Sequence, residues 1–443
     1  MSVPGRTKKV VSSSQTKADY LPAFLSFLFF LLSLPFLPAG YNSRMVFFGT
    51  ALLGFSGGLL GTFILLRRRA LMGDALAHST LPGIAIAFLV SPLFGIEGKS
   101  LPLLLLGGGI SGLFGVQVVR FLVRRTRLSE DAAIGAVLSV FFAAGVVLLG
   151  VIQIIGRGNE GGLNHFIYGQ TVSLTSGDVA SFVVLAVVFS IVVGLLFKEF
   201  GIVCFDDSYA ESLGLPVQLI DYLLMALLVL VILLGLQAVG LLLVVAILVV
   251  PAAAARFWSV DLKVLTLTGA SFGLLGAAIG VLLSAEYANL PAGSVIVLCL
   301  GVIFLLSFLL APQRGLVAAM IFSTRNRLQV AEEHLLNLSP DKIDFFVIVR
   351  LGGRVLALLL LLRLLRQRIV YYHLGGFELT LRGLERARVI RRNHKLWHAY
   401  LRKFSHLPLS HVNYSTDLVE HVLSPEIVAA LEAELHDAAG AHG

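Results

Sequence analysis

The sequence predicts a mainly α-helical membrane protein, in which a polytopic bundle of about ten transmembrane helices precedes a soluble domain. Hydrophobic residues make up 57% of the chain and charged residues only 14%, and the mean hydropathy is +0.91. A soluble domain carries about 25% charged residues, so this composition indicates an integral membrane protein. Apolar runs of about 18 residues or more, the length that crosses a bilayer, recur up to residue 311. From Gln313 onward the chain becomes charged, which indicates a change to a soluble, cytoplasmic part.

The apolar runs and the charges between them predict a topology. Short loops rich in Lys and Arg stay in the cytoplasm, and the arginines at 67–69 and 124–127, after the second and fourth spans, then lie on one side. An even number of spans places both termini in the cytoplasm, so residues 1–20 are expected to form a cytoplasmic tail. The first apolar run is either a retained span or a signal peptide, and no clear small-residue cleavage motif follows it, which favours a retained span. The spans are expected at residues 21–39, 45–66, 71–90, 101–123, 132–154, 179–197, 219–237, 241–258, 263–285 and 294–311.

The third predicted span carries two ionisable residues, Asp74 and His78. They are four residues apart, so on a helix they share one face. An aspartate inside a span costs about 2.5–3.5 kcal/mol on insertion scales and normally faces a pathway or a partner. A carboxylate and an imidazole together supply half of the coordination shell of a divalent transition metal. The alternative is an Asp–His pair that only orients the first turn of the helix.

A polar segment between the sixth and seventh spans, residues 204–216, predicts a short helix on the membrane face. Asp206 or Asp207 is a suitable N-cap, Gly214 a suitable C-terminal stop, and Pro216 prevents simple continuation. Such a helix is either a docking element for a partner or an ordinary amphipathic connector.

Other chemistry-bearing residues give weaker signals. His165, Asp178 and Glu286 lie in or beside predicted outer loops, where they either guide a cation or are simply solvated, and the second interpretation is favoured. Cys204 and Cys299 are far apart and predict no disulfide framework. The chain has no Gly-x-x-x-x-Gly-Lys-Ser/Thr motif, so ATP hydrolysis by that route would need a separate polypeptide.

The charged part predicts a winged-helix layout of helix, hairpin and helix. Residues 328–340 have helical apolar spacing, and residues 345–366 are very apolar but interrupted and followed by arginines that argue against burial in lipid. Two β-prone runs flank the glycine turn at 373–376, which predicts a hairpin. Thr380 is then the expected N-cap of a charged helix that begins at Leu381.

Four segments resemble the metal-ion permease branch of the ATP-binding-cassette importers, the subunits that move manganese, zinc or iron(II). They are residues 73–89, 126–149, 205–216 and 239–258. The resemblance implies a homodimeric, multi-pass permease without catalytic residues in a bacterial inner or plasma membrane. Two separate ATPase subunits and an extracytoplasmic metal-binding protein would be its partners, and the chain alone would bind no nucleotide.

The same resemblance assigns roles to individual residues. Asp74 and His78 would line the translocation path. The segment at 205–216 is similar to the family's coupling helix, so the residues at the ATPase contact would be Asp206, Asp207, Ala210 and Gly214.

Two segments of the tail, residues 379–401 and 415–435, resemble metal-dependent regulators of the diphtheria toxin repressor type. The resemblance implies a regulatory manganese or iron(II) site, since oxygen ligands with imidazole suit those ions. Solvated surface charges are the alternative. The sequence departs from the family pattern at His398, where a Glu is usual, and at Asn413, where a His is common. The implied ligands are His394, Asp417, Glu420 and His421, of which the last three share one helical face.

The segment aligned with the DNA-reading helix, about 355–366, has no Asn, Gln or Ser to contact base edges. DNA is therefore a disfavoured partner, although a basic tail can contact phosphates or the anionic inner leaflet. The expected domains are a permease at 21–311, a linker with a degenerate winged helix at 312–378, and a helical metalloregulator-like domain at 379–443.

The overall expectation is an importer permease with a metal-sensing or docking tail. Manganese is the first expectation for the cargo, with zinc and iron(II) open. The alternatives are a membrane-tethered, metal-dependent transcription regulator and a permease for chelated iron or another organic cargo.

Overall fold

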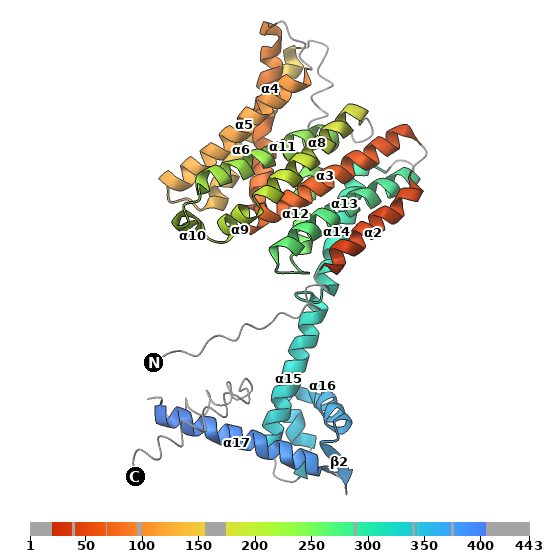
Figure 1. Ribbon diagram of the computed structural model, residues 1–443, viewed down its shortest axis with the longest axis vertical. Helices are drawn as coiled ribbons and strands as arrows, with labels where there is room; N and C mark the ends of the chain where they lie inside the picture. The colour runs from red at the N-terminus through yellow and green to blue at the C-terminus, as the bar shows by residue number, and fades with distance from the viewer. Residues whose placement is uncertain are drawn as a thin grey trace. The chain divides into compact units, whose positions relative to one another are not determined.

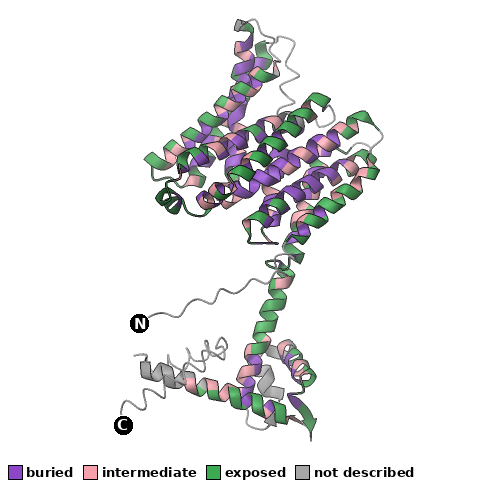
Figure 2. Ribbon diagram, viewed as in Figure 1, coloured by how far each residue is buried: buried purple, intermediate pink, exposed green. Residues whose placement is uncertain are grey.

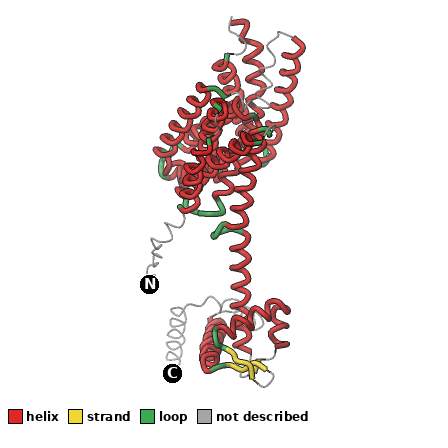
Figure 3. The backbone as a smooth tube through the Cα atoms, turned by 90° about the vertical axis from the view of Figure 1, so that its right-hand side faces the viewer, coloured by secondary structure: helices red, strands yellow, loops and turns green. Residues whose placement is uncertain are grey.

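The computed structural model describes residues 20–37, 40–67, 69–94, 100–155, 174–287, 290–338, 342–343, 345–373 and 376–404. The chain divides into two compact units, Met1–Ala318 and Ala319–Gly443. Nearly all the regular structure is helical, and the strands that the described residues form are confined to the second unit (Figure 3). The predicted fold class, a helical membrane bundle followed by a separate tail, is therefore confirmed.

The first unit is a bundle of helices (Figure 1). Its elements are α2 (Leu21–Ser33), the 3₁₀ turn η1 (Leu34–Phe36), α3 (Tyr41–Leu66), α4 (Ala70–Val90), the 3₁₀ turn η2 (Ser91–Phe94), α5 (Leu101–Arg125), α6 (Glu130–Ile155), α8 (Ser176–Leu195), α9 (Phe197–Phe205), α10 (Asp207–Ser212), α11 (Val217–Val239), α12 (Leu241–Ala255), α13 (Leu262–Glu286) and α14 (Ala292–Leu310).

Within the described residues, eight helices are long and apolar enough to cross a membrane. They correspond to eight of the predicted spans. The other two form shorter helices, α2 with 13 residues and α12 with 15. At about 1.5 Å of rise per residue, neither reaches the roughly 30 Å of a hydrocarbon core. Gly240, with φ +81°, separates α12 from α11 without an intervening loop.

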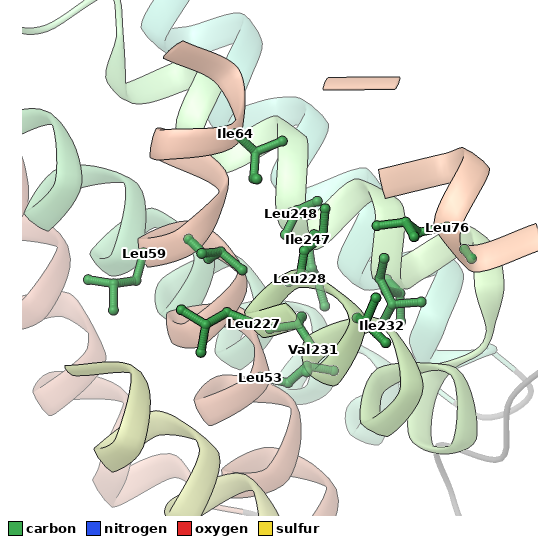
Figure 4. Packing of buried hydrophobic residues seen from close by; sticks show 14 of the residues in the cluster. Leu53, Leu59, Ile64, Leu76, Leu227, Leu228, Val231, Ile232, Ile247 and Leu248 are labelled. Carbon is green, nitrogen blue, oxygen red and sulfur yellow. The ribbon is translucent and has the colours of Figure 1, made fainter. Parts of the chain in front are cut away.

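Helix α3 lies at the centre of this unit and packs most extensively against α13 (Figure 2). The backbones approach so closely that a Cβ at Gly54 would collide with the carbonyl of Gly273, and one at Gly58 with the carbonyl of Gly269. Small residues spaced by four allow this approach in lipid, where packing replaces the hydrophobic drive. Leucine and isoleucine side chains of α3, α4, α11 and α12 fill the adjoining core (Figure 4).

The second unit forms the predicted winged-helix layout. Strands β2 (Val370–His373) and β3 (Gly376–Leu379) pair antiparallel with Tyr372 opposite Phe377. Strand β1 (Lys342–Ile343) adds to β3 to give the order β1-β3-β2. The hydroxyl of Thr380 accepts a hydrogen bond from the Gly383 N–H at 3.1 Å, which confirms the predicted cap. The first helix of the layout is longer than the predicted 328–340. The elements are α15 (Leu316–Leu338), β1 (Lys342–Ile343), α16 (Phe345–Arg366), β2 (Val370–His373), β3 (Gly376–Leu379) and α17 (Leu381–Phe404).

The tail has its own apolar core, in which Leu335, Leu360, Leu364 and Ala387 from α15, α16 and α17 are fully buried. Helix α16 therefore turns one face into this core.

Candidate metal site and membrane-face helix

Asp74 and His78 lie on the same face of α4, as their spacing predicts. The distance from His78 Nε2 to Asp74 Oδ1 is 3.5 Å, and the side chains are 15% and 38% exposed, respectively. Because α4 begins at Ala70 and has no acidic residue in its first turn, Asp74 lies a full turn inside the helix. The pair therefore does not cap the helix, which excludes the simple structural alternative.

Several features around His78 leave polar atoms without protein partners. The ring packs edge-on against Phe142 of α6, with centroids 4.7 Å apart. Among the described residues its Nδ1 is buried and has no hydrogen-bond partner. Pro82 lies four residues later inside the same helix and has no N–H, so the His78 carbonyl lacks its usual i+4 donor. An imidazole nitrogen and a carbonyl oxygen are thus left without their normal partners beside the Asp74 carboxylate.

One chain supplies too few side chains for a closed metal site here. In the part of the chain that the structure describes, no group of three or more His, Cys, Asp or Glu residues is placed to hold a metal ion. Divalent transition metals take four or more ligands. Asp74 and His78 therefore fit a cargo ion only if other ligands come from water, backbone oxygens or a second copy of the chain.

Helices α5 and α6 hold α4 in place (Figure 1). Next to the pair, the Ser111 hydroxyl of α5 donates to the Ser79 carbonyl of α4 at 2.6 Å. One turn further, α4 and α5 touch backbone to backbone, so a Cβ at Gly83 would collide with the carbonyl of Gly107. The contacts with α5 therefore hold one side of the helix that carries Asp74 and His78.

The short helix predicted within residues 204–216 is α10. Asp206 is its N-cap and accepts the Tyr209 N–H at 3.0 Å. Gly214 follows with φ +77°, where glycine is favoured, and its N–H donates to the Glu211 carbonyl at 2.9 Å. The start and the end of this helix were therefore both predicted correctly from the sequence.

The exposed side of α10 involves residues that the sequence analysis did not single out. Ala210 is fully buried, so its methyl group faces the protein's own core and is not presented to a partner. Phe205, Tyr209 and Leu213 are instead 71%, 56% and 52% exposed. Phe205 is the last residue of α9, Tyr209 lies within α10, and Leu213 is the C-cap of α10. Their spacing by four in the sequence was the available signal. We call these three residues the α10 stripe.

Other predicted residues have structural roles. Asp178 forms a capping box with Thr175 at the start of α8, and Glu286 is the last residue of α13. Burial raises the pKa of the Cys204 thiol to about 12, so the thiol by itself is protonated at neutral pH. His165 lies outside the described residues.

The regulatory metal site of the tail is not tested. His394 falls within α17, but its side chain is outside the description. Asp417, Glu420 and His421 lie outside the described residues. The proposed ligand set stays a prediction.

Comparison with known proteins identifies both parts of the chain. The family model "ABC 3 transport family" matches residues 41–311. The model "Iron dependent repressor, metal binding and dimerisation domain" matches residues 380–439.

Individual relatives match the membrane part. MntC, a manganese transport system membrane protein of Bacillus subtilis, is 40% identical over 296 residues, which cover 67% of this chain and 67% of MntC. TroC, a zinc transport system membrane protein of Treponema pallidum, is 41% identical over 277 residues, which cover 62% of this chain and 91% of TroC. The solved structure of PsaBC from Streptococcus pneumoniae in complex with Fab is 30% identical, with a TM-score of 0.55, and covers 65% of this chain and 97% of the matched chain. With the family model matching most of its length, this chain belongs to the ABC 3 transport family, and a tail similar to iron-dependent repressors follows its membrane part.

Proposed function

We propose that this chain is the permease subunit of an ATP-driven importer of divalent transition metal ions, with manganese as the first candidate cargo and zinc or iron(II) as alternatives. The observation that carries the proposal is the Asp74–His78 pair, which lies inside an apolar span with a partly exposed carboxylate. An ionisable pair in such a place normally serves a pathway. Relatives named as manganese and zinc transport membrane proteins support the same cargo class.

The proposal includes a homodimer. Two copies would bring two carboxylates and two imidazoles to one path, which is enough donors for a divalent ion. Coordination should be transient, because a site that binds too tightly does not release its cargo. An extracytoplasmic metal-binding protein would deliver the ion, and both termini would be cytoplasmic.

A separate ATPase subunit would dock on α10. The α10 stripe supports this, because three exposed aromatic or aliphatic side chains at and beside a short capped helix are typical of a contact surface. Asp206 and Gly214 then fix the two ends of the docking helix, and Ala210 anchors it to the bundle.

The tail would sense cytoplasmic metal through His394, Asp417, Glu420 and His421 and restrain the permease when those sites fill. The match to a repressor domain named for metal binding and dimerisation supports a regulatory role.

The test of the cargo proposal replaces the two path residues one at a time. Asp74→Asn and His78→Ala should reduce uptake of radiolabelled manganese to background, because each removes one of the few ligands available. Both variants should still insert in the membrane and bind the ATPase subunit. Glu286→Gln, which removes a carboxylate at the end of α13, is the matched control and should transport normally. Normal uptake by both path variants would contradict the proposal.

A further inference from the structure

A buried carboxylate lies at the end of the bundle that carries α10. Asp221 of α11 is 5% exposed and accepts hydrogen bonds from three arginines. Arg67 Nη2 donates to its Oδ1 at 2.8 Å, and Arg69 Nη1 reaches Oδ1 and Oδ2 at 2.7 and 2.9 Å. Arg120 of α5 donates to Oδ2 and also stacks over the Tyr222 ring, with its guanidinium carbon 4.1 Å from the centroid.

Two further carboxylates complete this group of charges. Arg69 Nε donates to Glu130 at the start of α6, at 2.7 Å, and Arg67 Nη1 donates to Asp207 of α10. Arg67 also donates to the Val203 carbonyl of α9 at 2.7 Å. We call the six charged residues, Arg67, Arg69, Arg120, Glu130, Asp207 and Asp221, the Asp221 cluster; they all line one cavity of about 190 Å³.

The cluster joins a buried part to an exposed part. Arg67 and Asp221 have side chains that are each 8% exposed, whereas the Asp207 side chain is 55% exposed. Burial alone would lower the pKa of Arg67, but its bonds to Asp221 and Asp207 raise it above its ordinary value. Breaking a buried charge pair is costly, whereas an exposed pair contributes little. Asp207 is thus the most exposed member of the cluster, and its contact with Arg67 ties α10 to the buried pair of Arg67 and Asp221.

The position of the arginines connects α10 to the metal pair. Arg67 follows the last residue of α3, and Arg69 immediately precedes α4. Asp74 lies five residues after Arg69, about 7.5 Å along the helix axis at the standard rise. Because a helical segment this short is stiff, a displacement of Arg69 moves Asp74 with it.

We propose that Arg67 and Asp221 are positioning residues that transmit a movement of α10, through Arg69, to the Asp74–His78 pair. This inference rests on the proposed importer function and deepens it. When Asp207 moves with α10, Arg67 is displaced, and because Arg67 and Arg69 share the Asp221 carboxylate, the start of α4 follows. The cluster thereby links ATP-driven movement at the membrane face to opening of the metal path.

The experiment uses the complete transporter, permease with its ATPase subunit, in proteoliposomes supplied with manganese and the external binding protein. It measures manganese transported per ATP hydrolysed, ATPase subunit co-purified with the permease, and thermal stability. Arg67→Gln should retain the ATPase subunit and lower the manganese-to-ATP ratio by about tenfold, the effect expected when a hydrogen bond to a charged group is removed. Arg67→Lys, which keeps the charge, should partly restore the ratio.

The matched control is Arg124→Gln. Arg124 lies one turn after Arg120 on α5 and lines the same cavity without being hydrogen-bonded to Asp221 in the described structure, so its ratio should equal that of the wild type. An unchanged manganese-to-ATP ratio in Arg67→Gln would overturn this inference and leave the proposed importer function in place. The inference would also be overturned if the ratio fell only because the variant is less stable or has lost the ATPase subunit, and if Arg67→Lys did not restore it. If the wild type moves no manganese, zinc or iron(II), the proposed function fails, and the inference fails with it.

Discussion

Glu332 of α15 shows how a single buried acid organises the tail. It is fully buried, and its carboxylate lies 3.2 Å from Arg363 Nε of α16 and 3.1 Å from Arg386 Nη2 of α17. Burial raises the pKa of Glu332 above its ordinary value of 4.5, although the two arginines oppose this shift. One carboxylate thus touches all three helices of the winged-helix layout.

The raised pKa predicts a pH dependence for the stability of the tail. The folded tail holds the proton on Glu332 more tightly than the unfolded chain does, so the contribution is fully present below pH 4.5 and is lost as pH rises through the folded-state pKa. Tail stability should therefore decrease as pH rises from about 4.5 towards neutrality. Glu332→Gln, which imitates the protonated acid, should remove this slope. Hydrogen exchange of α15, α16 and α17 in the full-length protein measures it.

The exposed acid Glu385 of α17 provides the control, because Glu385→Gln should leave the slope as it is in the wild type. Parallel pH profiles for the wild type and Glu332→Gln would contradict the prediction.

At the scale of single residues, local pairs were predictable and distant pairs were not. Asp74 and His78 are four positions apart, and helix geometry alone places them together. The partners of Asp221 are 101 to 154 positions away in the sequence. No short-range sequence pattern predicts that those arginines meet at Asp221, because only the tertiary packing of α3, α5 and α11 brings them together. From the sequence alone, these arginines predicted only that their loops lie on the cytoplasmic side of the membrane.

Among the helices, the crossing of α4 and α5 fixes the span that carries the metal pair. Gly83→Ala would push a methyl group into the Gly107 carbonyl. The backbones must then separate, so we expect a loss of about 1–3 kcal/mol in stability, typical of overpacking. Thermal unfolding in detergent measures this loss.

Gly150→Ala is the matched control. A methyl group added at Gly150 of α6 would meet no atom within 4 Å among the described residues, so this position should tolerate the change. Equal unfolding temperatures for the two variants would show that the close crossing contributes little.

Predictability of the elements depended on their local signals. Asp206 and Gly214 marked both ends of α10, and Thr380 marked the start of α17. Helix α9 was missed because Lys198 and Glu199 end the apolar run of α8, and no side-chain cap or breaker marks the start of a new helix at Phe197. Helix α12 begins at Leu241 as expected, but hydropathy could not show that it ends at Ala255, because Phe257 and Trp258 extend the apolar run.

For the whole molecule, the central question is what the tail does to the permease. If metal-loaded tail restrains transport, removal of residues 326–443 should allow uptake at internal metal loads that stop the full-length protein. His421→Ala in the full-length chain should act in the same direction, because it removes one proposed ligand. Manganese uptake by cells preloaded with increasing metal tests both.

Identical saturation of the truncated and full-length proteins would contradict a sensing role for the tail. A truncated protein that still transports would in any case show that the membrane unit works without the tail.

At this largest scale the sequence correctly predicted a membrane bundle followed by a separate helical tail, because composition changes sharply near residue 312. It did not predict that the helix after the bundle, α15, runs without interruption from Leu316 to Leu338. The polar residues in its middle, 323–327, resemble a linker in composition, whereas Leu335 and Leu336 near its far end are fully buried in the tail core.

Pro82 gives α4 an uneven bending stiffness. Because one backbone hydrogen bond is missing at His78, the helix bends most easily beside Asp74 and His78. The part after Pro82 can then stay in place while the part before it tilts. A pair of ligands on a rigid helix would bind an ion with the same affinity throughout the transport cycle. Ligands beside a flexible point of the helix can change their geometry when the helix bends, so binding and release of the ion correspond to two conformations of α4.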